Sequence, residues 1–175
     1  MVEPPLIIRP VEGHGLATIM ARKGVSPATI GKALGVEAPE GPRSAVTGKR
    51  RLVGIGPDTW LLMEDAIGPE WIAGIERCLV GLASVTEQSS GFALLDISGP
   101  SARAVLQKGL AIDLHPDAFP AGAAATSTID HIGVTFWCVA TNSFQIATFR
   151  SYGRDFRRWL EETATMTESA RERTE

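Results

Sequence analysis

The chain has 175 residues, of which 44% are hydrophobic and 21% are charged, a balance typical of a globular protein that folds without disulfides or metals. Its formal net charge of −3 argues against the clustered positive face of a nucleic-acid-binding protein. No stretch approaches the roughly 20 apolar residues of a membrane span. The first residues lack the basic start and apolar core of a secretory signal, so we expect a cytoplasmic protein.

Three helices are predicted from proline at their first turn and glycine just past their end. The segments 26–35, 68–81 and 99–109 each begin with Ser-Pro or Gly-Pro and end at a glycine. A fourth helix is expected after Ser151, because Phe156, Trp159 and Leu160 recur at helical spacing.

Short apolar runs between these helices predict strands. Two of the turns are typical of hairpins, Gly-Pro-Asp at 56–58 and Thr-Asn-Ser at 141–143. Residues 35–42 are expected to form a loop, and the polar segment 162–175 is expected to fray. The predicted strands are 16–20, 52–55, 60–63, 92–97, 132–137 and 144–149.

The order of elements repeats, since each half runs strand, helix, hairpin, helix. This order predicts an α+β fold of two ferredoxin-like βαββα units packed together. We expect one domain over residues 1–165, with pseudo-repeat halves at about 12–90 and 91–165, and a disordered tail over 166–175.

The two cysteines and the basic run offer little chemistry. Cys78 and Cys138 lie in apolar stretches without a C-x-x-C pair, so both are interpreted as buried free thiols. The run Lys49-Arg50-Arg51 is interpreted as an exposed strand entrance.

Motifs for nucleotides and metals are incomplete. The Gly54-Ile55-Gly56 run lies in a predicted hairpin rather than before a helix, and Gly48-Lys49 lacks the rest of a phosphate loop. The three histidines, at 14, 115 and 131, are too widely separated for common metal-ligand spacings. We therefore assign no catalytic residue and no metal ligand.

Three residues are the candidates for ligand binding. Asp96 ends an apolar strand before a helix, where a carboxylate accepts backbone N–H bonds or reads a ligand amine. Asp130 and His131 stand together at the head of a strand, as a satisfied polar pair or as an acid–base pair. In each case we favour the structural interpretation. Asp113 and Asp117 flank a loop and are interpreted as solvated, the alternative being a pairing with a partner's arginine.

Several runs resemble one family in order and spacing. The longest is Ser84 to Arg103, which includes Gly91-Phe92 and Asp96-Ile97-Ser98-Gly99-Pro100. Together they resemble the gamma subunit of heterotetrameric sarcosine oxidase over about residues 50–160. The other matching runs are 56–62, 105–109, 112–116, 119–122, 131–134 and 149–160.

That family is similar in turn to the folate-binding domain of aminomethyltransferases, so the resemblance implies the same paired α+β units. In those relatives a glycine-rich hairpin brings an aspartate to the folate. The comparable hairpin here is Ile129-Asp130-His131-Ile132, where His131 stands at the second acidic position.

The resemblance implies an accessory, noncatalytic chain in a flavin-dependent enzyme that oxidatively demethylates sarcosine. No cofactor is expected in this chain. FAD, FMN, NAD and zinc are implied in partner subunits, and tetrahydrofolate takes up the one-carbon unit in the complex. The alpha subunit is the most direct partner expected, then beta and delta, with a docking face that includes Trp137 or Phe119.

Two alternatives stay open. The chain could be a stand-alone folate-binding module related to aminomethyltransferases, with Asp96 and Asp130 reading the pterin. It could also be the equivalent subunit of a complex that oxidises another N-methyl amino acid, since the substrate would be read elsewhere.

Overall fold

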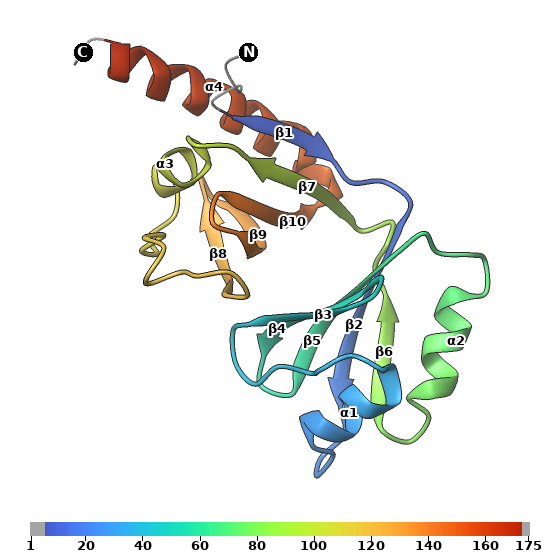
Figure 1. The fold of residues 1–175 in the computed structure, drawn as a ribbon. Helices are drawn as coiled ribbons and strands as arrows, with labels where there is room; N and C mark the ends of the chain where they lie inside the picture. Colours follow the sequence, from blue (N-terminus) through green and yellow to red (C-terminus); the bar gives the residue numbers. More distant parts are fainter. Residues whose placement is uncertain (1–5, 173–175) are drawn as a thin grey trace. The chain divides into compact units, whose positions relative to one another are not determined.

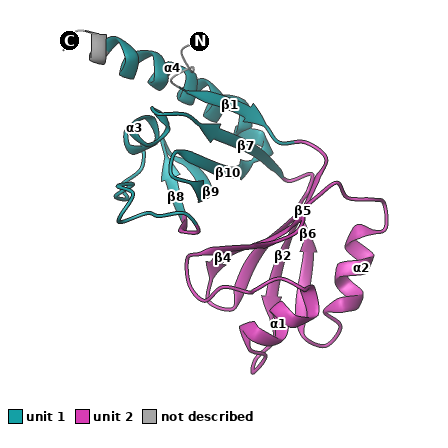
Figure 2. Ribbon diagram, viewed as in Figure 1, with its two compact units in different colours: residues 1–11, 92–121, 126–175 teal, residues 12–91, 122–125 magenta. Residues whose placement is uncertain are grey.

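The computed structural model describes residues 6–172, which form two compact units (Figures 1 and 2). Within the described chain, unit 1 holds residues 6–11, 92–121 and 126–172, and unit 2 holds residues 12–91 and 122–125. The division after Gly91 coincides with the boundary expected between the two halves. The start of the chain differs, because residues 6–11 belong with the second half. Packing of both halves into one domain stays a prediction.

Unit 2 is an antiparallel sheet with two short helices. The strands lie in the order β3-β4-β5-β2-β6, so β3 and β6 are the edges. The chain order is β2 (His14–Ala21), α1 (Pro27–Leu34), β3 (Ser44–Thr47), β4 (Arg50–Gly56), β5 (Thr59–Asp65), α2 (Trp71–Cys78) and β6 (Ala83–Glu87).

One face of this sheet packs on both helices. Strand positions alternate, so Ile19, Leu52 and Leu62 point to the same side and meet Ile30 of α1 and Ile75 of α2. All five side chains are buried, which gives unit 2 its own hydrophobic core.

Helix α1 shows why the sequence signals were informative. The Ser26 hydroxyl accepts a hydrogen bond from the Thr29 N–H, and Pro27 occupies the first helical position. Gly35 ends the helix with φ 68°, a left-handed conformation in which a side chain would be strained.

Unit 1 is a second antiparallel sheet, with strand order β1-β7-β10-β9-β8. Two helices and a 3-10 turn complete it, and the first two residues of β8 are counted with unit 2. The elements are β1 (Ile7–Pro10), β7 (Phe92–Ser98), α3 (Ala102–Gln107), β8 (Ala124–Ile129), β9 (Ile132–Ala140), β10 (Ser143–Phe149), η1 (Arg150–Tyr152) and α4 (Gly153–Glu172).

Each unit contains the predicted ferredoxin-like order with one additional strand. Taking β2, β4, β5 and β6 as the four strands of a βαββαβ motif gives the sheet order 4-1-3-2, and β7, β9, β10 and β1 give the same order. The additional strands, β3 and β8, each form a hairpin with the next strand. The α+β fold of two ferredoxin-like units is confirmed.

Two expectations about exposure and order differ from the structure. Helix α4 continues to Glu172, so residues 166–172 are helical where a disordered tail was expected, and 173–175 lie outside the described residues. Cys78, the last residue of α2, is exposed rather than buried, whereas Cys138 is buried, and both are free thiols.

Candidate functional site

Asp96 lies in the middle of the unit 1 sheet. Its cross-strand partners are Arg9 on β1 and Gln145 on β10, so all three side chains share one face. The next residue in this row is Trp137, whose Nε1 donates a hydrogen bond to Gln145 Oε1 at 2.9 Å. Asp96 thus belongs to a polar row across the sheet, and it is partly exposed.

Asp130 and His131 form the two-residue turn between β8 and β9. Their φ angles are 46° and 69°, so both are left-handed, as a type I′ hairpin turn requires. Aspartate is among the residues that tolerate this conformation best, because its short side chain can bond locally. Both side chains are exposed. This pair therefore shapes a tight hairpin, as the resemblance implied.

The structure does not bring Asp96 and the hairpin turn together. Asp96 is level with Trp137 on β9, two strands away. The turn ends directly before Ile132, which lies five residues from Trp137 along β9. These separations correspond to about 10 Å across the sheet and about 17 Å along the strand. One small ligand ring cannot contact both.

The two aromatic residues expected on an exposed docking face are buried. Trp137 has no exposed surface and Phe119 is 5% exposed, so this expectation was wrong. Phe119 stacks on Phe136 and Phe144, with ring centroids 5.2 and 6.4 Å apart. Among residues 6–169, the large apolar side chains that are exposed are different ones: Met20, Val46, Val80, Val139, Phe149, Tyr152 and Met166.

A buried carboxylate, Glu64 on β5, binds two basic side chains and a tryptophan in unit 2. Its Oε1 lies 2.9 Å from Lys49 Nζ, and its Oε2 lies 2.5 Å from Arg50 Nε and 3.0 Å from Trp71 Nε1. Arg50 also donates from Nη1 to the carbonyl of Leu34, which ends α1. Lys49 is exposed in the turn before β4, as expected for an exposed strand entrance, whereas Arg50 is only partly exposed because it pairs with Glu64.

The partners of Glu64 control its ionisation. Burial alone would raise the pKa of this carboxyl, but hydrogen bonds from Arg50, Lys49 and Trp71 and the Arg50 charge hold the pKa below the ordinary value of 4.5. The sequence signal was one glutamate at the end of the apolar run Trp60-Leu61-Leu62-Met63, beside a basic turn. The cluster ties both helices of unit 2 to its sheet.

In unit 1, Arg103 on α3 is the side chain that joins a helix and a loop to the sheet. Its guanidinium donates to the carbonyls of Thr141, Leu114 and Phe119, and it lies 5.1 Å from the ring centroid of Phe144. It therefore holds the loop between α3 and β8 against the sheet.

Cys138 lies beside Arg103. Its thiol donates to the Ala140 carbonyl, while Arg103 Nη2 lies 3.5 Å from the sulfur. Burial raises the pKa of Cys138 above its ordinary value of 9.0, against the opposing effect of the Arg103 charge. The thiol is therefore held in its neutral form.

The loop carboxylates and the remaining acidic residues form no metal centre within the described chain. Asp113 accepts the His115 N–H at 2.8 Å, and Asp117 lies 3.5 Å from His115 Nδ1, with all three residues exposed. No group of three or more histidine, cysteine or acidic side chains is placed to hold a metal in residues 6–172. In this same range, no helix is both long and apolar enough to cross a membrane.

Comparison with curated proteins finds gamma subunits of sarcosine oxidase. The chain is 33% identical over 110 residues to that of Corynebacterium sp. (strain P-1), covering 61% of this chain and 52% of the relative. It is 31% identical over 126 residues to that of an Arthrobacter species, covering 68% and 60%. For Corynebacterium sp. (strain U-96) the identity is 29% over 156 residues, covering 87% and 71%. The chain thus spans about half to seven-tenths of these relatives.

Solved structures agree in fold. A chain of the heterotetrameric sarcosine oxidase from Corynebacterium sp. U-96, in complex with pyrrole 2-carboxylate, matches with a TM-score of 0.83 and 25% identity over 92% of this chain and 84% of that chain. The glycine cleavage system aminomethyltransferase T from Bartonella henselae shares the fold, with a TM-score of 0.66 and 16% identity over 89% of this chain and 45% of that chain.

The family model described as "Sarcosine oxidase, gamma subunit family" matches residues 21–166. This range contains the Glu64 and Arg103 clusters and extends from the end of β2 into α4. The chain belongs to the sarcosine oxidase gamma subunit family.

Proposed function

We propose that this chain is the accessory, noncatalytic gamma subunit of a multi-chain, flavin-dependent sarcosine oxidase. The observation that carries the proposal is the agreement of family and fold over most of the chain. The family model spans residues 21–166, and the matching chain of a heterotetrameric sarcosine oxidase covers 92% of this one.

The geometry of the candidate residues is consistent with a structural role. Asp130 and His131 occupy left-handed positions that a tight hairpin requires, and Asp96 lies between Arg9 and Gln145 in a cross-strand row. Glu64, the buried carboxylate, has cationic partners that join helices to a sheet. Each group therefore has a role in the fold that does not require chemistry.

The proposal extends to the assembly. The alpha subunit would be the most direct partner, with beta and delta in the same complex, in the cytoplasm. FAD, FMN, NAD and zinc would be held by those partner chains, and tetrahydrofolate would accept the one-carbon unit. The charge of −3 and the apolar side chains on the surface suit a protein partner better than a nucleic acid.

The test is isolation of the tagged chain from its native cells under mild conditions. We expect a complex of several chains that absorbs in the visible region of flavins and oxidises sarcosine. A complex that oxidises only another N-methyl amino acid would keep the accessory role and change the substrate. A colourless chain that elutes alone would contradict the proposal.

The alternative of a stand-alone folate binder is tested on the isolated chain. Titration with tetrahydrofolate should give neither heat nor a thermal shift if the accessory role is correct. A saturable shift that Asp96→Asn removes and Asp113→Asn retains would favour folate binding by this chain. Asp113 is the matched control because its carboxylate lies exposed in a separate loop.

A further inference from the structure

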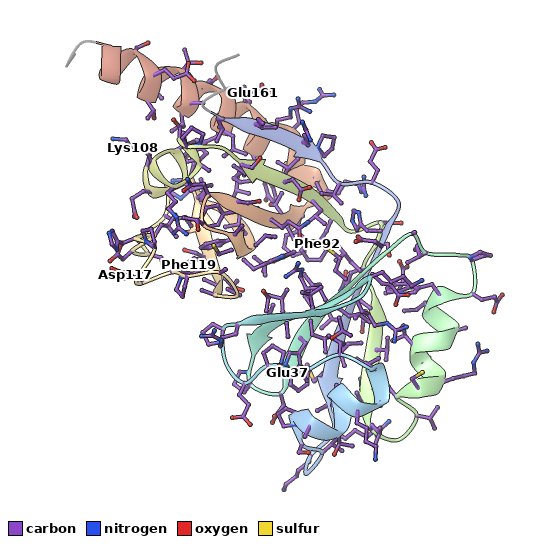
Figure 3. The ribbon with its side chains drawn as sticks, in the orientation of Figure 1. Glu37, Phe92, Lys108, Asp117, Phe119 and Glu161 are labelled. Atoms are coloured by element: carbon purple, nitrogen blue, oxygen red, sulfur yellow. The ribbon has the colours of Figure 1, made fainter. Side chains whose placement is uncertain are left out.

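The edge strand β3 borders a groove in unit 2. The groove is lined by α1, by the segment 35–40 that follows it, which includes Glu37 (Figure 3), and by residues 43–47. Because β3 is the last strand in its sheet, one side of its main chain faces this groove. A free edge is a template for another extended chain.

The chain already adds a strand to one end of this edge. The Ser44 N–H donates to the Gly122 carbonyl at 2.7 Å, and the Ala124 N–H donates to the Pro42 carbonyl at 2.9 Å. Arg43 and Ala123 form the antiparallel bridge between these bonds. Strand addition on this edge is therefore part of the fold of unit 2.

Beyond Ser44 and Gly122, no hydrogen bond continues this ladder within residues 6–172, and residues 120–122 could not supply both of the next pair of bonds. In an antiparallel strand, the N–H and C=O groups of successive residues point alternately to one neighbouring strand and to the other. The carbonyl of Arg43 accepts from the Gly54 N–H, so the main-chain groups of Arg43 point toward β4. The N–H and C=O groups of Ser44 and Val46 therefore point outward, away from β4. In the register that pairs Ser44 with Gly122, the residue opposite Val46 would be Pro120, which has no N–H to donate.

Val46 is consequently the next position for an added strand. Its side chain is 54% exposed, and in residues 6–172 no strand lies beyond β3 at this position. An exposed apolar residue on an open edge is the arrangement that proteins usually cover or protect with charge.

The groove walls set the chemistry of the occupant. Small residues line it from both sides, among them Ala28 and Gly31 of α1 and Ala45 of β3, which leaves room for a main chain. The lining charges balance, Lys32 and Arg43 against Glu37 and Glu40. A segment without strong net charge is therefore favoured.

We propose that an extended segment of a partner subunit, without strong net charge, adds to β3 as an antiparallel strand and continues the ladder that residues 122–124 begin. Val46 supplies the main-chain hydrogen bonds, and the groove between β3 and α1 receives the side chains. This inference rests on the proposed function, since it identifies the surface through which the chain joins its assembly.

Hydrogen exchange on the isolated chain and on the purified complex tests the proposal at single-amide resolution. The Val46 amide should exchange about 100-fold more slowly in the complex than in the free chain. The outward amide of Val85 on β6, the opposite edge, should not change. The Gln88 N–H donates to Leu16, and the Leu82 carbonyl accepts from Arg22, so the main-chain groups of the even-numbered residues of β6 face β2. The Val85 amide therefore faces away from the sheet.

Val46→Pro and Val85→Pro form a matched pair of variants. Each variant removes one outward N–H. The Val46 N–H is not bonded to β4 and the Val85 N–H is not bonded to β2, and an edge strand tolerates proline at such a position. Val46→Pro should reduce the yield of partner chains about tenfold, which corresponds to the loss of one main-chain hydrogen bond. Val85→Pro should retain the complex. Circular dichroism of both isolated variants checks their folding.

Each outcome separates the two claims. A wild-type chain that assembles, with a Val46 amide unprotected in the complex, overturns the strand-addition proposal and leaves the proposed function intact. Protection of Val46 in a dimer of this chain alone would also overturn it, because the occupant would be a second copy. A wild-type chain without partners would overturn both. If Val46→Pro does not fold, the exchange measurement on the wild type decides.

Discussion

Unit 2 supplies its fifth strand, β6, after α2, whereas unit 1 takes the equivalent strand, β1, from the start of the chain. Both strands are antiparallel edge partners of the first strand of the motif, β2 and β7. The hydrogen bonds of an antiparallel ladder depend on the register and direction of the two strands, and not on where each strand lies in the chain. The repeat is therefore clearer in the sheets than in the order of elements.

The units also differ in how an arginine joins helix and loop to sheet. In unit 2, Arg50 pairs with the buried carboxylate of Glu64, and Lys49 adds a second positive charge. In unit 1, Arg103 donates to three main-chain carbonyls. Carbonyl acceptors do not titrate, so the chemistry that anchors unit 2 depends on pH and that of unit 1 does not.

A tryptophan on the second helix is common to both units, and each lies against a glycine. A Cβ on Gly15 would lie 2.7 Å from the ring of Trp71, and one on Gly109 would lie 2.6 Å from the ring of Trp159. Contacts this short leave no room for a side chain. The shared arrangement shows that close helix packing, in addition to hydrophobic area, is required in both halves.

The largest loss of stability is expected from Gly54→Ala, a substitution whose contacts all lie within unit 2. A Cβ at this position would lie 2.0 Å from the carbonyl oxygen of Gly41, a main-chain atom that cannot move aside as a side chain does. We expect a loss of about 3 kcal/mol in the free energy of unfolding. Chemical denaturation, followed by exchange of amides in each unit, would show whether unit 1 keeps its structure when unit 2 opens.

Gly56→Ala is the control, because it lies on the same strand and its added Cβ would approach only the Thr59 Cβ, at 3.9 Å. It should change stability by well under 1 kcal/mol. Equal losses for both glycine variants would show that the crossing of residue 41 over β4 is not what constrains Gly54.

Arg103→Met should destabilise unit 1 by about 2 kcal/mol. The substitution keeps an unbranched apolar stem but leaves the carbonyls of Leu114 and Phe119 without their donor. The measurement is urea denaturation, with amides of unit 1 exchanging faster than those of unit 2. Arg157→Met is the control, since Arg157 pairs with Glu161 on the exposed side of α4 and such pairs contribute little. A loss that is spread equally over both units would contradict the local role.

The sequence predicted the helices and the six central strands because their signals are local. Ser26 and Gly35 act on α1 within one turn, and the apolar alternation of β9 and β10 lies within each strand. The four strands that were missed, β1, β3, β6 and β8, are all at sheet edges. Edge strands are short or half polar, so their assignment depends on partners far away in the chain.

The candidate site was only partly predictable for a related reason. The hairpin turn at Asp130 and His131 was expected from the resemblance to aminomethyltransferases, and the structure confirms the hairpin. The Glu64 cluster was missed because its partners come from β4, β5 and α2, and no spacing rule connects them. Burial of Trp137 was missed because an alternating strand does not show which face is covered.

Glu64→Gln tests the pH dependence of unit 2 and should cost about 1 kcal/mol at pH 7, since an amide keeps one acceptor but loses the charge. The pKa of Glu64 is lowered in the folded chain. Its contribution is therefore complete above the unfolded pKa, near 4.5, and is lost as the pH falls toward the lower folded pKa. Wild-type stability should decline more steeply than that of Glu64→Gln below pH 4.5. Parallel curves would contradict the role of the ion pairs.

The two thiols offer the smallest and most local measurement of the difference between the units. Cys78, exposed at the end of α2, should react promptly with a thiol reagent, whereas Cys138 should react only when unit 1 opens. Burial raises the pKa of Cys138, which keeps the thiol neutral while unit 1 is closed. Mass spectrometry after timed labelling measures both rates, and Cys78→Ser isolates the slow one. If Arg103 holds unit 1 closed, Arg103→Met should accelerate labelling of Cys138, and Arg157→Met should not. Prompt labelling of Cys138 in the unsubstituted chain would show that the unit 1 core opens far more easily than its packing implies.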